Sequence, residues 1–279
     1  MPSLIAERTE AVLNPRQEAS AGVRAVSRHR RRAARWLRGS VGLVLLAVVW
    51  EVAPRAGLVD PYFVTPFSGV VEAWWELARS GQLLDQVQAS LVRSAAGFSL
   101  AVITAIPLGA AIAWYRPVRE LFTPVLEVFR NTAALAILPV FTLVLGIGET
   151  SKIAIVLYAC FFPILLSTIS GVAAVDTQLL RSARVLGLSP VTTFRKVVFP
   201  AAVPTIFTGI RIAGASAILV LIAAEMIGAT AGLGYFINYS QYNFLIPQMY
   251  AAIVTTSAIG LAVNYALVSI ERRLSRWRA

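Results

Sequence analysis

Very few side chains in this sequence could do covalent chemistry. Cys160 is the only cysteine and His29 the only histidine among the 279 residues. A lone thiol inside an apolar run cannot form an internal disulfide, and neither residue has the partners that a metal site or a nucleophile–base pair needs. The sequence therefore predicts no catalytic residue, no metal site and no cofactor bound by this chain.

Two charges stand alone in an apolar segment, Arg211 and Glu225. They are 14 positions apart, or about 21 Å along a helix, so they cannot pair within one helix. If the segment spans a membrane, each charge should face a cavity or a partner. For Glu225 a place beside a solute path and a contact with loop backbone both remain open. Arg211 could attract an anion or extend toward the membrane surface.

Other polar or small residues could line such a path. Asn131 begins an uncharged run, where it could face the path or make an interhelical hydrogen bond. Gly214 and Ser216 lie between the two charges, and small residues allow close helix approach. The competing interpretation for these small residues is packing toward lipid. Our candidate path residues are Asn131, Arg211, Gly214, Ser216 and Glu225.

The composition indicates that these residues are carried by membrane-spanning helices. The chain is 57% hydrophobic and 14% charged, whereas soluble domains are about 25% charged. Several uncharged runs approach or exceed the roughly 18 residues of a spanning helix. A net charge of +11 could suggest nucleic acid, but nine of the 25 Lys and Arg residues lie in the first 40. Cations that flank apolar spans are typical of membrane proteins, so we expect no nucleic-acid partner.

We predict an all-α membrane protein of about six spans. The expected order is a flexible basic tail (1–35), a membrane domain (36–272) and a short C-terminal tail (273–279). If the connections between successive spans alternate between the two sides of the membrane, most loop cations fall on one side. The positive-inside rule identifies that side as cytoplasmic, and both termini lie on it. The expected location is the bacterial plasma membrane. The predicted spans are 37–54, 90–114, 120–146, 152–173, 203–228 and 248–269.

Two local features accompany the spans. Residues 65–83 predict a short amphipathic helix, either lying in the outer membrane interface with Trp74 and Trp75 at headgroup depth or packed as an ordinary loop helix. Pro139 falls within the third predicted span. Because proline interrupts the helical hydrogen-bond ladder, we expect a kink there.

The connection at about 174–204 is unusually rich in signals. Gly187 fits a helix end, Ser189 an N-cap, and Pro190 the first turn of a second short helix. Apolar residues recur at helical spacing and form a ridge that the membrane cannot cover, so the ridge needs a partner. The product is a compact helical elbow on the cytoplasmic side.

This connection resembles the EAA loop of ABC-importer permeases. The family pattern is Glu-Ala-Ala, three residues, Gly, nine residues, Ile, one residue, Leu-Pro. The sequence keeps every spacing, with Arg181-Ser182-Ala183, Gly187, Val197 and Phe199-Pro200. Arg181 stands where the family has an acid. The resemblance implies a coupling helix that docks on a cytoplasmic ATPase. The implied docking residues are Arg181, Ser182, Ala183, Leu186, Gly187, Leu188, Ser189, Pro190, Phe194 and Pro200.

Roughly residues 40–270 resemble one branch, the permeases of aliphatic sulfonate, taurine and nitrate importers. The matching pieces include "FRNTAALAILPVFTLVLGIGETSK" and "AAEMIGATAGLGYFI". The resemblance implies a type I importer permease fold and a homodimer. It also implies a partner ATPase dimer that holds ATP and Mg, and an extracytoplasmic solute-binding protein. The chain has no G-x-x-x-x-G-K-[ST] motif of its own.

Two other functions compete with an importer permease. A secondary transporter without an ATPase would need intramembrane ion-coupling groups, and Arg211 and Glu225 are the two charges that we assign to the interior of a span. An integral-membrane enzyme would need a His, Asp or Cys constellation that the spans lack. The sequence favours the ATP-driven importer.

Overall fold

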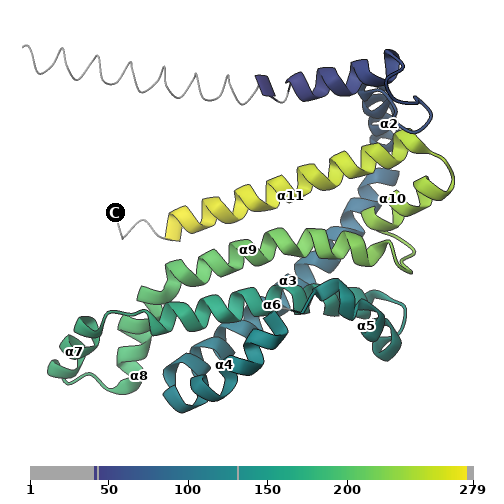
Figure 1. Ribbon diagram of the computed structural model, residues 1–279. Coiled ribbons are helices and arrows are strands. Elements are labelled where there is room, and N and C mark those ends of the chain that lie inside the picture. The colour runs from purple at the N-terminus through teal and green to yellow at the C-terminus, as the bar shows by residue number, and fades with distance from the viewer. Residues whose placement is uncertain (1–40, 43, 131, 275–279) are drawn as a thin grey trace, which may run out of the picture. The chain divides into compact units, whose positions relative to one another are not determined.

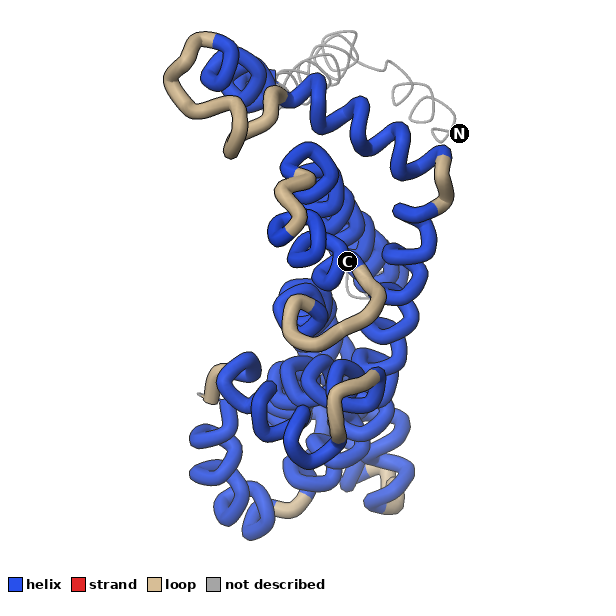
Figure 2. Tube along the Cα trace, turned by 90° about the vertical axis from the view of Figure 1, so that its right-hand side faces the viewer, coloured by secondary structure: helices blue, strands red, loops and turns tan. Residues whose placement is uncertain are grey.

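The computed structural model describes residues 41–42, 44–130 and 132–274. Within those ranges every regular element is helical and no strand occurs (Figure 2), which confirms the predicted all-α class. The chain divides into two compact units, Met1–Ser68 and Gly69–Ala279. Residues 1–35, the predicted basic tail, lie outside the described ranges.

In the first unit, residues 44–55 are helical, and the chain after them folds back on the helix end. The indole Nε1 of Trp50 donates to the carbonyl of Thr65 at 3.1 Å, and the Glu51 carboxylate accepts from the Ser68 amide at 2.9 Å. The first predicted span, 37–54, begins outside the described residues.

The second unit is a bundle of long helices (Figure 1). In chain order the helices from residue 67 onward are α2 (Phe67–Arg79), α3 (Gln82–Trp114), α4 (Arg116–Arg130), η1 (Ala134–Ile137), α5 (Leu138–Leu145), α6 (Glu149–Ala173), α7 (Thr177–Val185), α8 (Pro190–Thr193), η2 (Phe194–Val198), α9 (Phe199–Glu225), α10 (Leu233–Tyr242) and α11 (Ile246–Leu274).

Four helical runs of the described residues are long and apolar enough to cross a membrane, or five if one bent pair counts as a span. They are α3, α6, the run from α8 through α9, and α11. These runs confirm the predicted spans at 90–114, 152–173, 203–228 and 248–269. The fifth span begins earlier than expected, because helix extends without interruption from Pro190.

The third predicted span, 120–146, is broken. The axes of Pro117–Phe129 and Ala134–Leu145 differ by 82°. Our expectation of a kink at Pro139 is wrong in position, since Pro139 lies in the first turn of α5. A proline there loses no helical hydrogen bond, because the first N–H groups of a helix have no intrahelical acceptor.

The amphipathic helix is confirmed as α2. Its buried face is Val70, Ala73 and Leu77. Trp74 donates from Nε1 to Thr255 Oγ1 of α11 at 3.0 Å, whereas Trp75 is 52% exposed. Trp74 is thus engaged with a neighbouring helix, as expected for a packed loop helix.

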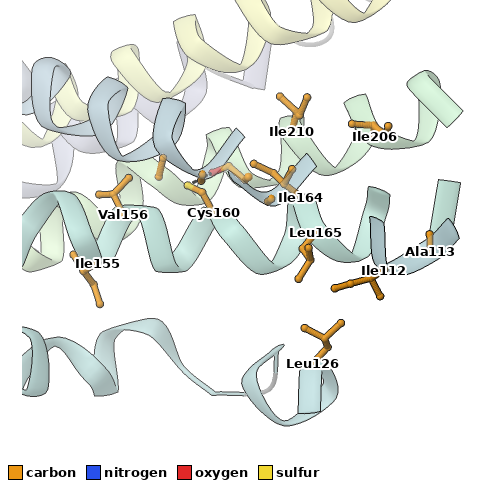
Figure 3. Close-up of a cluster of buried hydrophobic side chains, with 14 of the residues drawn as sticks. Ile112, Ala113, Leu126, Ile155, Val156, Cys160, Ile164, Leu165, Ile206 and Ile210 are labelled. Carbon is orange, nitrogen blue, oxygen red and sulfur yellow. Dashed lines mark hydrogen bonds between the residues drawn. The ribbon is translucent and has the colours of Figure 1, made fainter. Parts of the chain in front are cut away.

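The core lies where α6 packs against α3 and α9. Figure 3 shows Val156, Cys160 and Ile164 of α6 among buried residues of the flanking helices. Cys160 is fully buried, so it acts as a small apolar core residue. Leu126 brings α4 into the same cluster.

Close approach of these helices depends on residues without a side chain. A Cβ on Gly97 of α3 would lie 2.7 Å from Val156 Cβ and 2.8 Å from the Ile153 carbonyl oxygen of α6. The backbone carbonyl of α6 cannot move away from an added Cβ as a flexible side chain could. The spacing between α3 and α6 at this point is therefore one that only glycine allows.

We predict that Gly97→Leu destabilises the bundle by about 1–3 kcal/mol, the usual cost of overpacking. The matched control is Gly260→Leu in α11, where an added Cβ meets nothing within 4 Å. Thermal unfolding of the purified chain in detergent should show a lower midpoint for the first variant only. Equal midpoints would contradict the close packing of α3 on α6.

Candidate functional site

The elbow, residues 176–200, is built from local capping interactions. Asp176 caps α7 by accepting from the Gln178 amide at 2.7 Å. At the other end Gly187 has φ +68°, and the amides of Gly187 and Leu188 donate to the carbonyls of Arg184 and Ala183 at 3.0 and 3.1 Å. This is a Schellman motif, whose left-handed residue is usually glycine. The predicted helix end at Gly187 is confirmed.

The second half of the elbow begins as predicted. The Ser189 hydroxyl accepts from the Thr192 amide at 3.3 Å, and Pro190 occupies the first turn of α8. The π-helical segment η2 then joins α8 to α9, with Pro200 in the first turn of α9. Sequence reasoning missed η2. Pro200 has no N–H for the preceding turn, which offers a physical reason for irregular hydrogen bonding there.

The elbow carries an exposed apolar ridge. Val185, Leu186 and Val191 are 88%, 75% and 77% exposed, although Ala183 beside them is buried. Arg181 and Ser182 are also exposed. Nothing in the described part of the chain covers this ridge, and apolar surface of this kind is typical of a protein interface.

Phe194 connects the elbow to the bundle. Its ring lies edge-on to Trp114 of α3, with centroids 5.1 Å apart. Leu188 is half-buried as well. The elbow is therefore anchored on one face while the ridge stays exposed on another.

The structure does not bring the five path candidates together. Arg211 donates to Glu271 of α11 at 3.1 Å, so it has a specific partner that sequence reasoning did not identify. Gly214 also faces α11, where an added Cβ would lie 2.3 Å from Leu267. Asn131 lies outside the described residues. Only Ser216 lines a cavity.

That cavity, here called the hydroxyl-lined cavity, has a volume of about 380 Å³ and lies between α4, η1, α6 and α9. Stacked rings of Phe129 and Phe162, 5.6 Å apart, form part of its wall. It has no charged side chain among its described lining residues. The hydroxyl groups on its wall belong to Thr132, Tyr158, Ser167 and Ser216.

Glu225 lies instead in a charge cluster in which Ser90, Arg93 and Glu225 are buried and Glu149 is 62% exposed. Its carboxylate accepts from Arg93 Nη1 at 2.7 Å, from the Ser90 hydroxyl at 2.8 Å and from the Gly234 amide at 3.0 Å. Arg93 also donates from Nη2 to Glu149 at 2.6 Å. Glu225 thus contacts backbone, as expected, but in the first turn of α10 and not in a loop. The contact with the loop before α10 is made by Arg93, which donates to the Ala231 carbonyl at 2.6 Å.

Sequence reasoning overlooked Arg93. Its guanidinium is 5% exposed and links α3 to α6 and α9. The available signal was its position inside the predicted span 90–114, where an unpaired cation would be costly. Lys152, at the start of the predicted span 152–173, is also buried: it is 2% exposed and donates to the carbonyls of Gly148 and Gly228 at 3.2 Å.

We predict that Arg93→Met lowers stability by about 3–5 kcal/mol, because it leaves Glu225 buried without its cation. The comparison variant is Arg211→Met. Its ion pair with Glu271 leaves the arginine 40% and the glutamate 22% exposed, so removing this cation leaves a carboxylate that is less buried than Glu225 and should cost less. Thermal unfolding in detergent distinguishes the two, and similar midpoints would contradict the importance of burial.

Comparisons with known proteins agree on one class. Residues 105–276 match the model of the family described as binding-protein-dependent transport system inner membrane component. A probable ABC transporter permease protein of Brucella abortus is 39% identical over 75% of this chain and 84% of its own length. The Escherichia coli taurine transport system permease protein TauC is 33% identical over 85% and 89%.

A third relative is the nitrate import permease protein NrtB of Synechocystis, 30% identical over 84% of this chain and 88% of its own length. Among solved structures, the MetNI methionine ABC transporter in inward-facing conformations matches with a TM-score of 0.59 and 20% identity. This match covers 69% of this chain and 95% of the other. At that identity the match concerns the fold.

Proposed function

Because the chain belongs to the family of binding-protein-dependent transport system inner membrane components, we propose that two copies of it form the translocation path of an ABC importer. The chain is an importer permease and not an enzyme, and a separate ATPase subunit hydrolyses ATP. Membership also implies a solute-binding protein and a place in the inner membrane. The twofold assembly is our inference.

The exposed ridge of the elbow is the observation that carries the coupling proposal. The apolar surface lies on both sides of the Schellman motif at Gly187 and is formed by Val185, Leu186 and Val191. An ATPase subunit with a complementary groove would bury this surface. ATP binding would then move the elbow, and with it α9, because helix continues from Pro190 to Glu225. In this proposal ATP and Mg are bound by the ATPase and no cofactor by this chain.

The same proposal sets the orientation. Arg181, Arg184, Arg195 and Lys196 belong to the elbow, and Arg272 and Arg273 end α11. Cations accumulate on the cytoplasmic side of membrane proteins. The elbow and both termini are therefore proposed to be cytoplasmic.

We predict that Gly187→Val uncouples uptake from ATP hydrolysis without preventing insertion. An added Cβ meets nothing within 4 Å, so the cost is backbone strain at φ +68° rather than a clash. This strain is worth about 1–2 kcal/mol for a residue other than glycine. Gly187→Asn is the matched control, since asparagine tolerates the left-handed region.

Reconstituted vesicles containing the ATPase would report both activities. The valine variant should lose most solute-dependent stimulation of hydrolysis and most uptake, whereas the asparagine variant keeps both. Loss of membrane insertion in the valine variant, or equal activity of the two variants, would count against the coupling role of this turn.

For the solute we propose a small oxyanion. It would be either nitrate or an organic sulfonate such as taurine, the solutes in the names of the relatives. Two observations support a solute path that is lined by no unpaired charged side chain. Arg211 and Glu225 are both paired, with Glu271 and Arg93, and the hydroxyl-lined cavity has hydroxyls and aromatic rings on its wall. In the structure Thr132, Tyr158 and Ser216 donate to backbone carbonyls at 3.0, 3.4 and 3.1 Å. A hydroxyl has a single donor, so each would turn from its carbonyl to donate to an anion, and such a contact would be weak. The paired charges are also poor candidates for the ion coupling of a secondary transporter.

We predict that Ser216→Leu lowers uptake about tenfold, because it fills the cavity with apolar volume and removes a hydroxyl. A tenfold decrease corresponds to an activation free energy that is roughly 1.4 kcal/mol higher. Ser257→Leu on α11 is the control, since Ser257 is exposed and does not line the cavity.

The assay uses vesicles with the ATPase, the cognate binding protein and a panel of taurine, an alkanesulfonate, nitrate and an amino acid. The expected result is uptake of one oxyanion class that falls only in the Ser216 variant. Uptake of the amino acid alone would overturn the solute assignment. Uptake that persists with a hydrolysis-dead ATPase would overturn the importer mechanism.

A further inference from the structure

A second cavity, here called the apolar cavity, lies beside the elbow and shares Val191 with the exposed ridge. Its volume is about 580 Å³. One wall comes from the last turns of α3, including Pro107, Trp114 and Tyr115, and the other from α8, η2 and α9, including Val191, Phe194 and Phe199. None of its described lining residues is charged. A hollow with such walls favours an apolar occupant over water.

The cavity lies where a membrane-spanning helix ends. The 33 residues of α3 extend about 50 Å, more than the roughly 30 Å of the hydrocarbon core. Trp114 and Tyr115 close this helix, and aromatic residues at span ends gather at headgroup depth. Tyr115 is 60% exposed. These aromatic residues favour a place for the cavity near the level where acyl chains meet headgroups.

Two cations adjoin the apolar wall. Arg195 lies in η2, between the lining residues Phe194 and Phe199. Lys196 is its neighbour, and both are exposed. Within the described part of the chain neither side chain has a recorded ion pair or hydrogen bond. A phosphodiester would supply the missing counter-charge.

We infer that the apolar cavity is a binding site for an anionic phospholipid. One acyl chain lies in the cavity against the touching rings of Trp114 and Phe194, and the phosphate group lies against Arg195 and Lys196. Basic pockets beside membrane helices bind anionic headgroups in this way. The charge beside the apolar wall favours such a lipid over a protein segment, which would need its own acidic residue at the same depth. The lipid would wedge between α3 and the elbow.

Trp114 is a built-in reporter for this site. The chain has six tryptophans, and a variant with the other five replaced by phenylalanine leaves Trp114 alone. The full chain, assembled with its ATPase in nanodiscs, is titrated with phosphatidylglycerol or phosphatidylcholine carrying brominated acyl chains, which quench nearby indole fluorescence. ATP hydrolysis by the assembly confirms that the variant is folded, and the quenching itself does not depend on transport.

We expect brominated phosphatidylglycerol to quench Trp114 at a mole fraction on the order of tenfold lower than brominated phosphatidylcholine, as two cations near a membrane surface should produce. Arg195→Gln with Lys196→Gln should abolish this difference. The matched control, Arg272→Gln with Arg273→Gln at the end of α11, should keep it. Ala111→Phe, which narrows the cavity from α3 without removing a cation, should weaken quenching by the anionic lipid.

Three outcomes would overturn the inference. Equal quenching by the two lipids would mean contact with bulk bilayer only. No quenching by either lipid would mean that a second copy of the chain or the ATPase fills the cavity. Quenching by phosphatidylglycerol that survives loss of Arg195 and Lys196 would place the headgroup elsewhere. Failure of any kind leaves the transport proposal unaffected, because uptake is not the readout.

Discussion

Burial of Arg93 between two carboxylates is the constraint on which the bundle depends most. Ions in a medium of low dielectric constant must be paired and hydrogen-bonded. Arg93 meets this demand with Glu149 of α6 and Glu225 of α9, and Ser90 and the Gly234 amide complete the shell of Glu225. The start of α6, the end of α9 and the first turn of α10 are thereby fixed to α3. Little freedom remains at this end of the bundle.

The opposite end is arranged differently. There the elbow exposes its ridge, and its contact with the bundle includes the aromatic pair Trp114–Phe194. One helical run from Pro190 to Glu225 joins the two ends over about 54 Å. A displacement of the elbow would thus be transmitted along a helix whose far end is anchored by ions. Such an arrangement suits a subunit that converts movement of an ATPase into movement of its spans.

The two charges within α9 are both paired with charges on other helices. Arg211 is paired with Glu271, and Glu225 with Arg93, so the two charges within α9 serve helix–helix contacts. The hydroxyl-lined cavity between α4, α6 and α9 is neutral on its described walls. As the path that we propose, such a cavity would suit a subunit whose energy comes from ATP on a partner and whose solute arrives on a binding protein. Neither step requires an ion site in the membrane.

The sequence by itself determined the features that depend on near neighbours. The long apolar runs specified α3, α6, α9 and α11, and the caps at Gly187 and Ser189 specified the elbow, because hydrophobicity and capping act within a few residues. Only the tertiary structure decided which charges meet: Arg93 and Glu225 are 132 positions apart and Arg211 and Glu271 are 60. The tertiary structure also showed that the chain bends between α4 and α5 and that Gly214 packs against α11. Such contacts depend on how whole helices cross, which no local pattern contains.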